Sequence, residues 1–494
     1  MGRGEGALAA RKQLVDMPAG GRSEAVRPEL LGIAEQLVAA SPSEEEVEVF
    51  ISRSRGTSIR AYRGEVESLE SSEISGAGVR VVIDGRQGFS YAASLDEALL
   101  LAALEDARDN ARFATPDEHA GLPAPDGASV APVDGWSNEL ATFSIEDKVA
   151  MALQVEARVR GGDPRITEVP FADYEDAMIE EAVVSTLGIC ASARRNWCSV
   201  SVQAIASGMD SSATSTGFSV SRDPALLNID RAVRDALERS VRLLGARPVR
   251  SGQFSIVMDA RVTAALLAVI AGALSGERAH RGQSFLEGRS GERIAGDLVS
   301  IVEDPTNPAA LGASSYDAEG LACRRHVLVA DGVLEGFVYD TYASRLARGQ
   351  AAGNDSQAAG SDRLVAGSDR FAAGSAVRSG FSTAPVAGCR AISFQPGDMT
   401  FDQVLERVQT GLFVQSVTGI HSGVNPVSGD FSVGAEGLMI RGGSLAEPVR
   451  KVTIASTLQR MLQSVLVVGG ELEWLPGPAA GQPLAIADLS VSGS

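Results

Sequence analysis

Histidine and cysteine are scarce in this chain of 494 residues, which contains only four of each. The cysteines are too few and too scattered to form a disulfide framework, and a reducing compartment fits them better. They are Cys190, Cys198, Cys323 and Cys389. No histidine is followed by glutamate, so the His-Glu pair that begins many zinc-hydrolase helices is missing. A hydrolytic zinc site needs about three converging protein ligands and a carboxylate that handles the proton of the attacking water.

The best remaining pair of metal-binding residue types is Cys323 and His326. These residues lead into residues 327–334, which an Asp-Gly pair predicts to be a hairpin. An odd spacing places the two side chains on opposite faces of a strand. We therefore interpret them as a half-buried cysteine and a surface histidine, and we expect no metal site in this chain.

Long apolar runs and an excess of positive charge are also missing. The longest apolar stretch, residues 262–274, is well short of the roughly 20 residues that span a bilayer. The N-terminus lacks the apolar core of a secretory signal. We expect a cytoplasmic protein with no membrane partner. The net charge of −19 makes nucleic acid an unsuitable partner.

One cluster of arginines could be taken for a nucleic-acid patch. Its members alternate with apolar and acidic residues at helical spacing, which favours a solvated helix face. They are Arg231, Arg234, Arg239, Arg242, Arg247 and Arg250.

Hydrolase and nucleotide-binding motifs are missing as well. There is no Gly-x-Ser-x-Gly elbow, because the spacing around Ser432 is wrong. Neither a phosphate-binding Gly-x-x-x-x-Gly-Lys loop nor a strand-linked Gly-x-Gly-x-x-Gly is present. An independent hydrolase with a hidden site is the least favoured of the functions considered below.

The pattern of residues predicts an α+β fold with two domains. Residues 1–27 are charged and rich in glycine, and we expect them to be a disordered extension. Residues 28–247 alternate between half-buried strands and capped helices, which predicts an antiparallel sheet with helices on one face. Arg247-Pro248 breaks the chain, and a β-rich C-terminal domain is expected over residues 248–494.

A biased segment lies inside the C-terminal domain, at residues 349–380. Its glycines recur every seventh residue, and Gly-Ser-Asp-Arg occurs twice. Few apolar positions accompany the repeat, so a flexible or partly ordered loop is predicted in place of a coiled coil. Whether it is a lid or a linker is left open.

The most informative segment, residues 418–437, is rich in glycine and turn-forming residues. Asn425-Pro426 and residues 428–430 predict successive turns. Such a loop brings backbone close to something, either its own chain or a ligand. We therefore select six residues as candidates for contact with substrate or with a partner. They are Gly419, His421, Gly423, Asn425, Gly429 and Asp430.

Together with residues 411–414, this segment resembles the signature near the C-terminus of the TldD/TldE (PmbA) family, a two-subunit zinc-dependent peptidase. Residues 290–293 (SGER), 303–305 (EDP) and 316–320 (YDAEG) are similar to the central pattern of that family. The resemblance covers nearly the whole chain beyond its N-terminal extension. It implies that residues 262–274 take the place of the helix that carries His-Glu-x-x-x-His in TldD.

Because that motif is missing, the chain resembles the TldE or PmbA type of subunit. The resemblance implies a heterodimer in which a TldD-type partner supplies zinc, while this chain closes the chamber and helps to bind an extended peptide. Two alternatives remain open. The same complex could act as an amidase or N-deacylase on a small natural product, or the chain could be a non-catalytic, peptide-binding homodimer.

Overall fold

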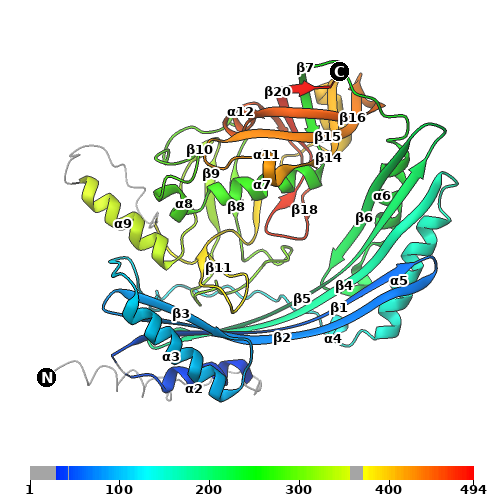
Figure 1. Cartoon of the computed structure of the whole chain (residues 1–494). Helices are drawn as coiled ribbons and strands as arrows, with labels where there is room; N and C mark the ends of the chain where they lie inside the picture. Colours follow the sequence, from blue (N-terminus) through cyan, green and yellow to red (C-terminus); the bar gives the residue numbers. More distant parts are fainter. Residues whose placement is uncertain (1–28, 43, 356–370, 494) are drawn as a thin grey trace.

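The computed structural model describes residues 29–42, 44–355 and 371–493. In Figure 1 a long, curved N-terminal sheet holds the C-terminal half on its concave side, and helices α2, α3 and α5 cover its outer face. The mixed fold confirms the predicted α+β class. The extension at residues 1–27 lies outside the described residues, so its predicted disorder stays a prediction.

The N-terminal sheet has six antiparallel strands in the order β3-β2-β1-β4-β5-β6. Four of them are 17 to 20 residues long, about three times the usual strand length of roughly 5–6 residues. The strands are β1 (Glu46–Tyr62), β2 (Glu65–Ile83), β3 (Arg86–Ala92), β4 (Ile166–Ser185), β5 (Cys190–Ser207) and β6 (Ser212–Ser221). The turn between β2 and β3 uses Asp84 and Gly85 with positive φ, as their sequence predicts.

Helices flank this sheet and begin at polar caps. They are α2 (Glu29–Ala39), α3 (Glu97–Phe113), α4 (Asn138–Ala141), α5 (Ile145–Arg160), the short 3-10 helix η1 (Pro224–Leu226) and α6 (Ile229–Val241). Asp96 caps α3 and Ser144 caps α5, each through its side chain. Apolar side chains of α2 and α3 form one core with β1 to β3, and those of α5 and α6 form another with β4 and β5.

The arginine-bearing helix α6 corrects one prediction, because it is not simply a solvated face. Arg231 forms an ion pair with Glu473 at 2.5 Å, and Arg239 forms one with Asp259 at 2.7 Å. Arg239 is also buried and donates to the backbone oxygen of Gln415. The counter-charges come from residues distant in sequence, so local spacing could not reveal this contact with the C-terminal half.

The C-terminal half contains a six-stranded sheet in the order β16-β15-β14-β7-β20-β17, and β16 also pairs with β20, so five strands close on themselves. Its strands are β7 (Gly252–Met258), β14 (Thr410–Thr418), β15 (Asp430–Arg441), β16 (Ser444–Thr457), β17 (Val465–Val468) and β20 (Leu484–Ser492). Smaller sheets comprise β8 (Ile301–Glu303), β9 (His326–Ala330), β10 (Val333–Leu334), β11 (Ala376–Val377), β12 (Val386–Ala387), β13 (Ile392–Phe394), β18 (Glu473–Trp474) and β19 (Ala480–Gly481).

The helices of this half include α7 (Ala260–Ala273), which confirms the apolar helix predicted at residues 262–274. The others are α8 (Gly276–His280), α9 (Thr341–Asp355), α10 (Phe401–Val408), α11 (Ile420–Gly423) and α12 (Leu458–Gln463). The predicted loop at residues 349–380 is wrong in its first part, because α9 continues to Asp355. Contacts between α9 and the N-terminal half stabilise the last turns of this helix. Gly349, for example, lies against His119. Residues 356–370 lie outside the described part.

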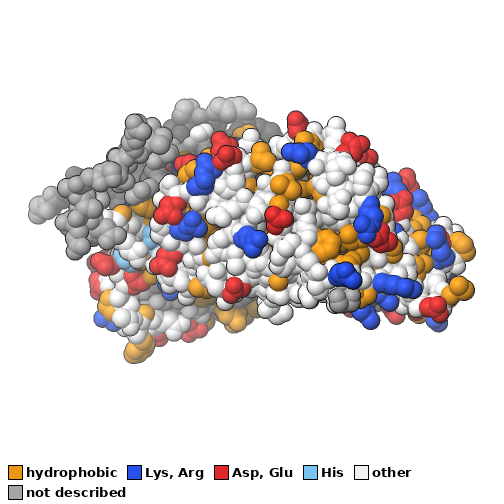
Figure 2. Space-filling model, turned by 90° about the horizontal axis from the view of Figure 1, so that it is seen from above, with side chains coloured by type: hydrophobic (Ala, Val, Ile, Leu, Met, Phe, Trp, Pro, Cys, Tyr) orange, Lys and Arg blue, Asp and Glu red, His pale blue; other side chains and the backbone are white. Residues whose placement is uncertain are grey.

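The molecular surface mixes both charge signs. On the face shown in Figure 2, acidic and basic side chains are interspersed and form no continuous basic band. Within the described ranges, no helix is long and apolar enough to cross a membrane.

Candidate functional site

The glycine-rich segment forms an exposed connection between β14 and β15. Gly419 has φ of 80° and precedes α11, and Gly429 has φ of 83°. The Asn425 side chain accepts hydrogen bonds from the backbone nitrogens of Val427 and Ser428, and Gly429 N donates to Asn425 O at 2.8 Å. The predicted turns are therefore present.

The six candidate residues do lie together in this loop, but most of their interactions hold the loop itself. Ser428 Oγ donates to Asp430 at 2.7 Å, and His421 is exposed. A Cβ atom on Gly423 would lie 1.9 Å from the backbone oxygen of Ser432. The close approach that requires glycine here is therefore to the chain's own strand β15. Whether these residues contact a substrate stays a prediction.

Gly423→Ala is expected to lower the free energy of unfolding by about 1–3 kcal/mol, because the new methyl group meets backbone that cannot move aside. Urea denaturation followed by tryptophan fluorescence would measure the loss. The matched control is Gly32→Ala in helix α2, where nothing lies within 4 Å of the added carbon. That control should gain about 0.5–1 kcal/mol. Equal stability of Gly423→Ala and the native chain would mean that the loop tolerates displacement.

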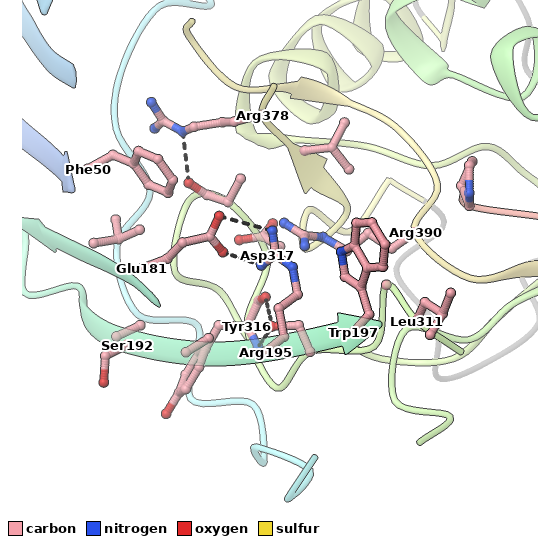
Figure 3. A pocket seen from close by; sticks show the side chains of 18 of the residues that line it. Phe50, Glu181, Ser192, Arg195, Trp197, Leu311, Tyr316, Asp317, Arg378 and Arg390 are labelled. Carbon is pink, nitrogen blue, oxygen red and sulfur yellow. Dashed lines mark hydrogen bonds and ion pairs between the residues drawn. The ribbon is translucent and has the colours of Figure 1, made fainter. Parts of the chain in front are cut away.

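A second candidate site is a cavity of about 460 Å³ between the N-terminal sheet and the C-terminal half. Figure 3 shows Glu181 of β4 and Arg195 of β5 reaching from the sheet toward Asp317 and Arg390 of the opposite wall. Apolar side chains, including those of Phe50, Trp197 and Leu311, complete the lining. A concave, mostly apolar space with a few convergent polar groups is typical of small-ligand sites.

Most charged groups of this cavity are already paired. Arg195 binds both carboxylate oxygens of Glu181, at 2.5 and 3.2 Å. Burial disfavours the charged form of Glu181, but the Arg195 guanidinium outweighs it and holds the pKa of this carboxyl below its usual range. Arg378 forms an ion pair with Glu48.

Asp317 differs from Glu181 in the direction of its pKa shift. Burial and, secondarily, the neighbouring Glu319 carboxylate raise the pKa of Asp317 to about 7. Its oxygens accept hydrogen bonds from the backbone nitrogens of Glu319, Leu321 and Ala376. Asp317 therefore orders the loop between β8 and β9.

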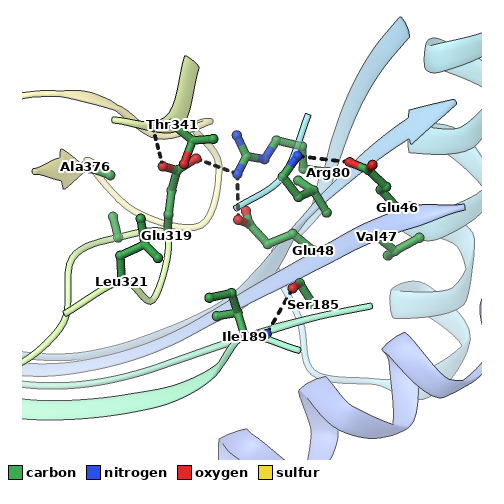
Figure 4. A network of polar contacts seen from close by, with 12 residues as sticks. Glu46, Val47, Glu48, Arg80, Ser185, Ile189, Glu319, Leu321, Thr341 and Ala376 are labelled. Carbon is green, nitrogen blue, oxygen red and sulfur yellow. Dashed lines mark hydrogen bonds and ion pairs between the residues drawn. The ribbon is translucent and has the colours of Figure 1, made fainter. Parts of the chain in front are cut away.

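Behind the cavity, a buried ion network joins the two halves of the chain (Figure 4). Arg80 Nη2 of β2 donates to Glu48 at 2.6 Å and to Glu319 at 2.8 Å. Glu319 also accepts from the backbone nitrogen of Thr341 at 2.8 Å. With Arg378 the network holds two positive and two negative groups, all at most 3% exposed. Its charges are thus balanced.

A smaller cavity, of about 300 Å³, lies beside helix α7. Arg261, Ala264, Ala265 and Ala268 form its α7 wall, and it shares Pro476 and Pro478 with the larger cavity. The alanines offer no metal ligand, and Arg261 is a cation that binds Thr216 O and Asp235. Across residues 29–42, 44–355 and 371–493, no group of three or more His, Cys, Asp or Glu side chains could hold a metal ion.

Cys323 and His326 do not share a strand. Cys323 is buried before β9 begins, and this burial raises the pKa of its thiol to about 12. His326 is the first residue of β9 and is half-buried, and burial lowers its pKa to about 4. The predicted half-buried cysteine and surface histidine are therefore wrong in their degree of burial.

Sequence reasoning missed the cavity residues. Glu181, Arg195, Asp317, Arg378 and Arg390 come from five separate segments, and no spacing connects them. The one available signal was that Asp317 belongs to the YDAEG segment of residues 316–320.

Comparison with known proteins assigns a family. Residues 47–111, 138–244 and 251–493 match, in order, the PmbA/TldA metallopeptidase domain 1, central domain and C-terminal domain. The last match begins close to the predicted boundary at 248, while the region before it is divided in two.

Relatives match over nearly full length. The metalloprotease PmbA of Escherichia coli O157:H7 is 23% identical over 93% of this chain and 95% of its own. A PmbA homolog of Haemophilus influenzae is 24% identical over 90% and 92%. The crystal structure of TldE from Thermococcus kodakarensis has the same fold, with a TM-score of 0.80 and 19% identity, over 94% of this chain and 99% of that one. The chain therefore belongs to the PmbA/TldD family of metallopeptidases.

Proposed function

We propose that this chain is the zinc-free, TldE-type subunit of a heterodimeric metallopeptidase. In this proposal a TldD-type partner with a His-Glu-x-x-x-His helix binds the zinc that polarises the scissile carbonyl and activates water. This chain closes the chamber and helps to hold an extended peptide.

The observation that carries the proposal is the chemistry of helix α7. By the family resemblance, α7 takes the place of the ligand helix, and it faces a cavity between the two halves of the chain. At that cavity it presents Arg261, Ala264, Ala265 and Ala268, none of which is a zinc ligand. The donor set therefore does not fit a zinc ion.

The peptide-binding part of the proposal rests on exposed backbone. Residues 65–75 of β2 are paired to β1 on one side only, because β3 pairs with β2 from Ala77 onward. Such an edge can accept an extended peptide through main-chain hydrogen bonds. The exposed loop between β14 and β15 offers a second backbone surface.

We expect the purified chain to contain no stoichiometric zinc and to hydrolyse neither unfolded peptides nor small amides. Elemental analysis measures the first property and a peptide-release assay the second. About one zinc per chain, lost on Cys323→Ala or His326→Ala, would contradict the proposal.

Mixed with a TldD-type partner, the chain should form a stable complex that hydrolyses unfolded peptides and loses this activity on chelation. Size-exclusion chromatography and the same assay test both expectations. Selective cleavage of a small N-acyl amide would redirect the proposal to the amidase alternative. Chelator-insensitive hydrolysis by this chain alone would refute the division of roles.

A further inference from the structure

We propose that the 460 Å³ cavity between the two halves of the chain binds a monocarboxylate that carries an apolar group, with Arg390 as the carboxylate ligand. The inference concerns this chain alone and does not depend on whether it pairs with a zinc-containing subunit.

The first step is the state of Arg390. Among the described residues it is the arginine of the cavity wall that forms no ion pair, whereas Arg195 and Arg378 each bind a glutamate. Its side chain makes one hydrogen bond, from Nη2 to the backbone oxygen of Ala376 at 3.3 Å. Its Nε lies buried without a partner. Arg390 therefore keeps a positive charge that the protein does not neutralise by direct contact.

The second step concerns the net charge of a ligand that can bind in the cavity. Glu181 and Asp317 line the same space, and both would repel an anion of high charge. Of the described arginines in the cavity wall, only Arg390 has a guanidinium without a carboxylate bound to it, although its backbone nitrogen donates to Glu303 at 2.7 Å. One unpaired guanidinium favours one carboxylate, which it can bind through two parallel N–H donors. A phosphate dianion would leave negative charge without a partner.

The third step is the rest of the wall. Phe50, Val183, Trp197, Leu311 and Pro478 give the cavity an apolar lining that spans the sheet and the C-terminal loops. The volume falls within the range of about 300–1,000 Å³ that is typical of small-ligand pockets. An aliphatic or aromatic group next to the carboxylate would be desolvated there, which stabilises the bound state.

Two sources supply this chemistry, the C-terminus of a peptide and a free carboxylic acid of similar size. Isothermal titration calorimetry of the full chain with N-acetylphenylalanine and with a tripeptide ending in phenylalanine distinguishes them. Tighter binding of the tripeptide indicates a peptide C-terminus, and equal or weaker binding indicates a free acid. The C-terminal amide of each probe tests the need for the carboxylate.

We expect each acid to bind at least about tenfold more tightly than its amide, because a charge-assisted hydrogen-bond pair is lost in the amide. Arg390→Gln should weaken binding of the acid by about tenfold or more. Arg325→Gln, a change of an exposed arginine outside the cavity, should leave affinity unchanged.

A second variant separates the site from the fold. Ala193→Phe on β5 fills the cavity without removing a charge, so it should abolish binding while urea denaturation shows a folded chain. Equal affinity for acid and amide, unchanged affinity of Arg390→Gln, or no binding of either acid at millimolar concentration would overturn the proposal.

Discussion

Arg80→Met is expected to lower the free energy of unfolding by about 3–5 kcal/mol, because it leaves two buried carboxylates with one cation between them. Arg80 is 3% exposed and binds Glu48 and Glu319. Urea denaturation followed by tryptophan fluorescence would measure the change. Arg112→Met removes an exposed ion pair with Asp109 and should change stability by no more than about 1 kcal/mol.

The double variant Arg80→Met/Glu319→Gln tests the cause. It restores the balance of one cation and one anion in the network, and glutamine can still accept the hydrogen bond from Thr341 N. We expect it to recover part of the lost stability. A double variant less stable than Arg80→Met would show that packing, not uncompensated charge, accounts for the loss.

Asp340→Asn is expected to stabilise the chain above neutral pH by an amount on the order of 2–4 kcal/mol. Burial and the neighbouring Glu319 carboxylate raise the pKa of Asp340 from 3.8 to about 7. Since the folded state favours the protonated form, the native chain should lose stability as the pH rises from about 4 through about 7. Asparagine stays neutral over this range.

The asparagine oxygen can still accept the hydrogen bond that Asp340 receives from Ala343 N at 2.8 Å, so the start of α9 is preserved. Denaturation at pH 5 and pH 8 would measure the difference between the variant and the native chain, which should grow with pH. The exposed Asp109→Asn should show no such growth. A pH-independent difference for Asp340→Asn would mean that Asp340 is already charged at pH 5.

Local signals in the sequence predicted local structure well. Helix α7 was expected at residues 262–274 and is observed at Ala260–Ala273, because an apolar run ends at small residues there. The Asp-Gly pair at 331–332 forms the expected turn, and the pair at 84–85 forms another turn with positive φ. Each of these features depends on neighbours within a few residues.

Contacts between residues that are distant in sequence could not be predicted from local patterns. The partners of α6 are Asp259 and Glu473, and no pattern within residues 229–241 indicates them. The candidate loop residues were selected because the sequence shows where glycines cluster. The close neighbour that leaves no room for a side chain at position 423 is Ser432 of the same chain. The cavity was missed because its charged groups meet only when the sheet and the C-terminal half come together.

The length of the N-terminal strands has a consequence for synthesis on the ribosome. One edge of β1 pairs with β4, which begins at Ile166, more than 100 residues after β1 ends at Tyr62. At about 5–20 residues per second, this edge waits several seconds or more for its partner. Val47, Val49 and Ile51 of β1 pack against α2 and α3, which are both synthesised before β4. The nascent chain therefore exposes unpaired backbone groups along one edge of β1, where aggregation or chaperone binding competes with folding.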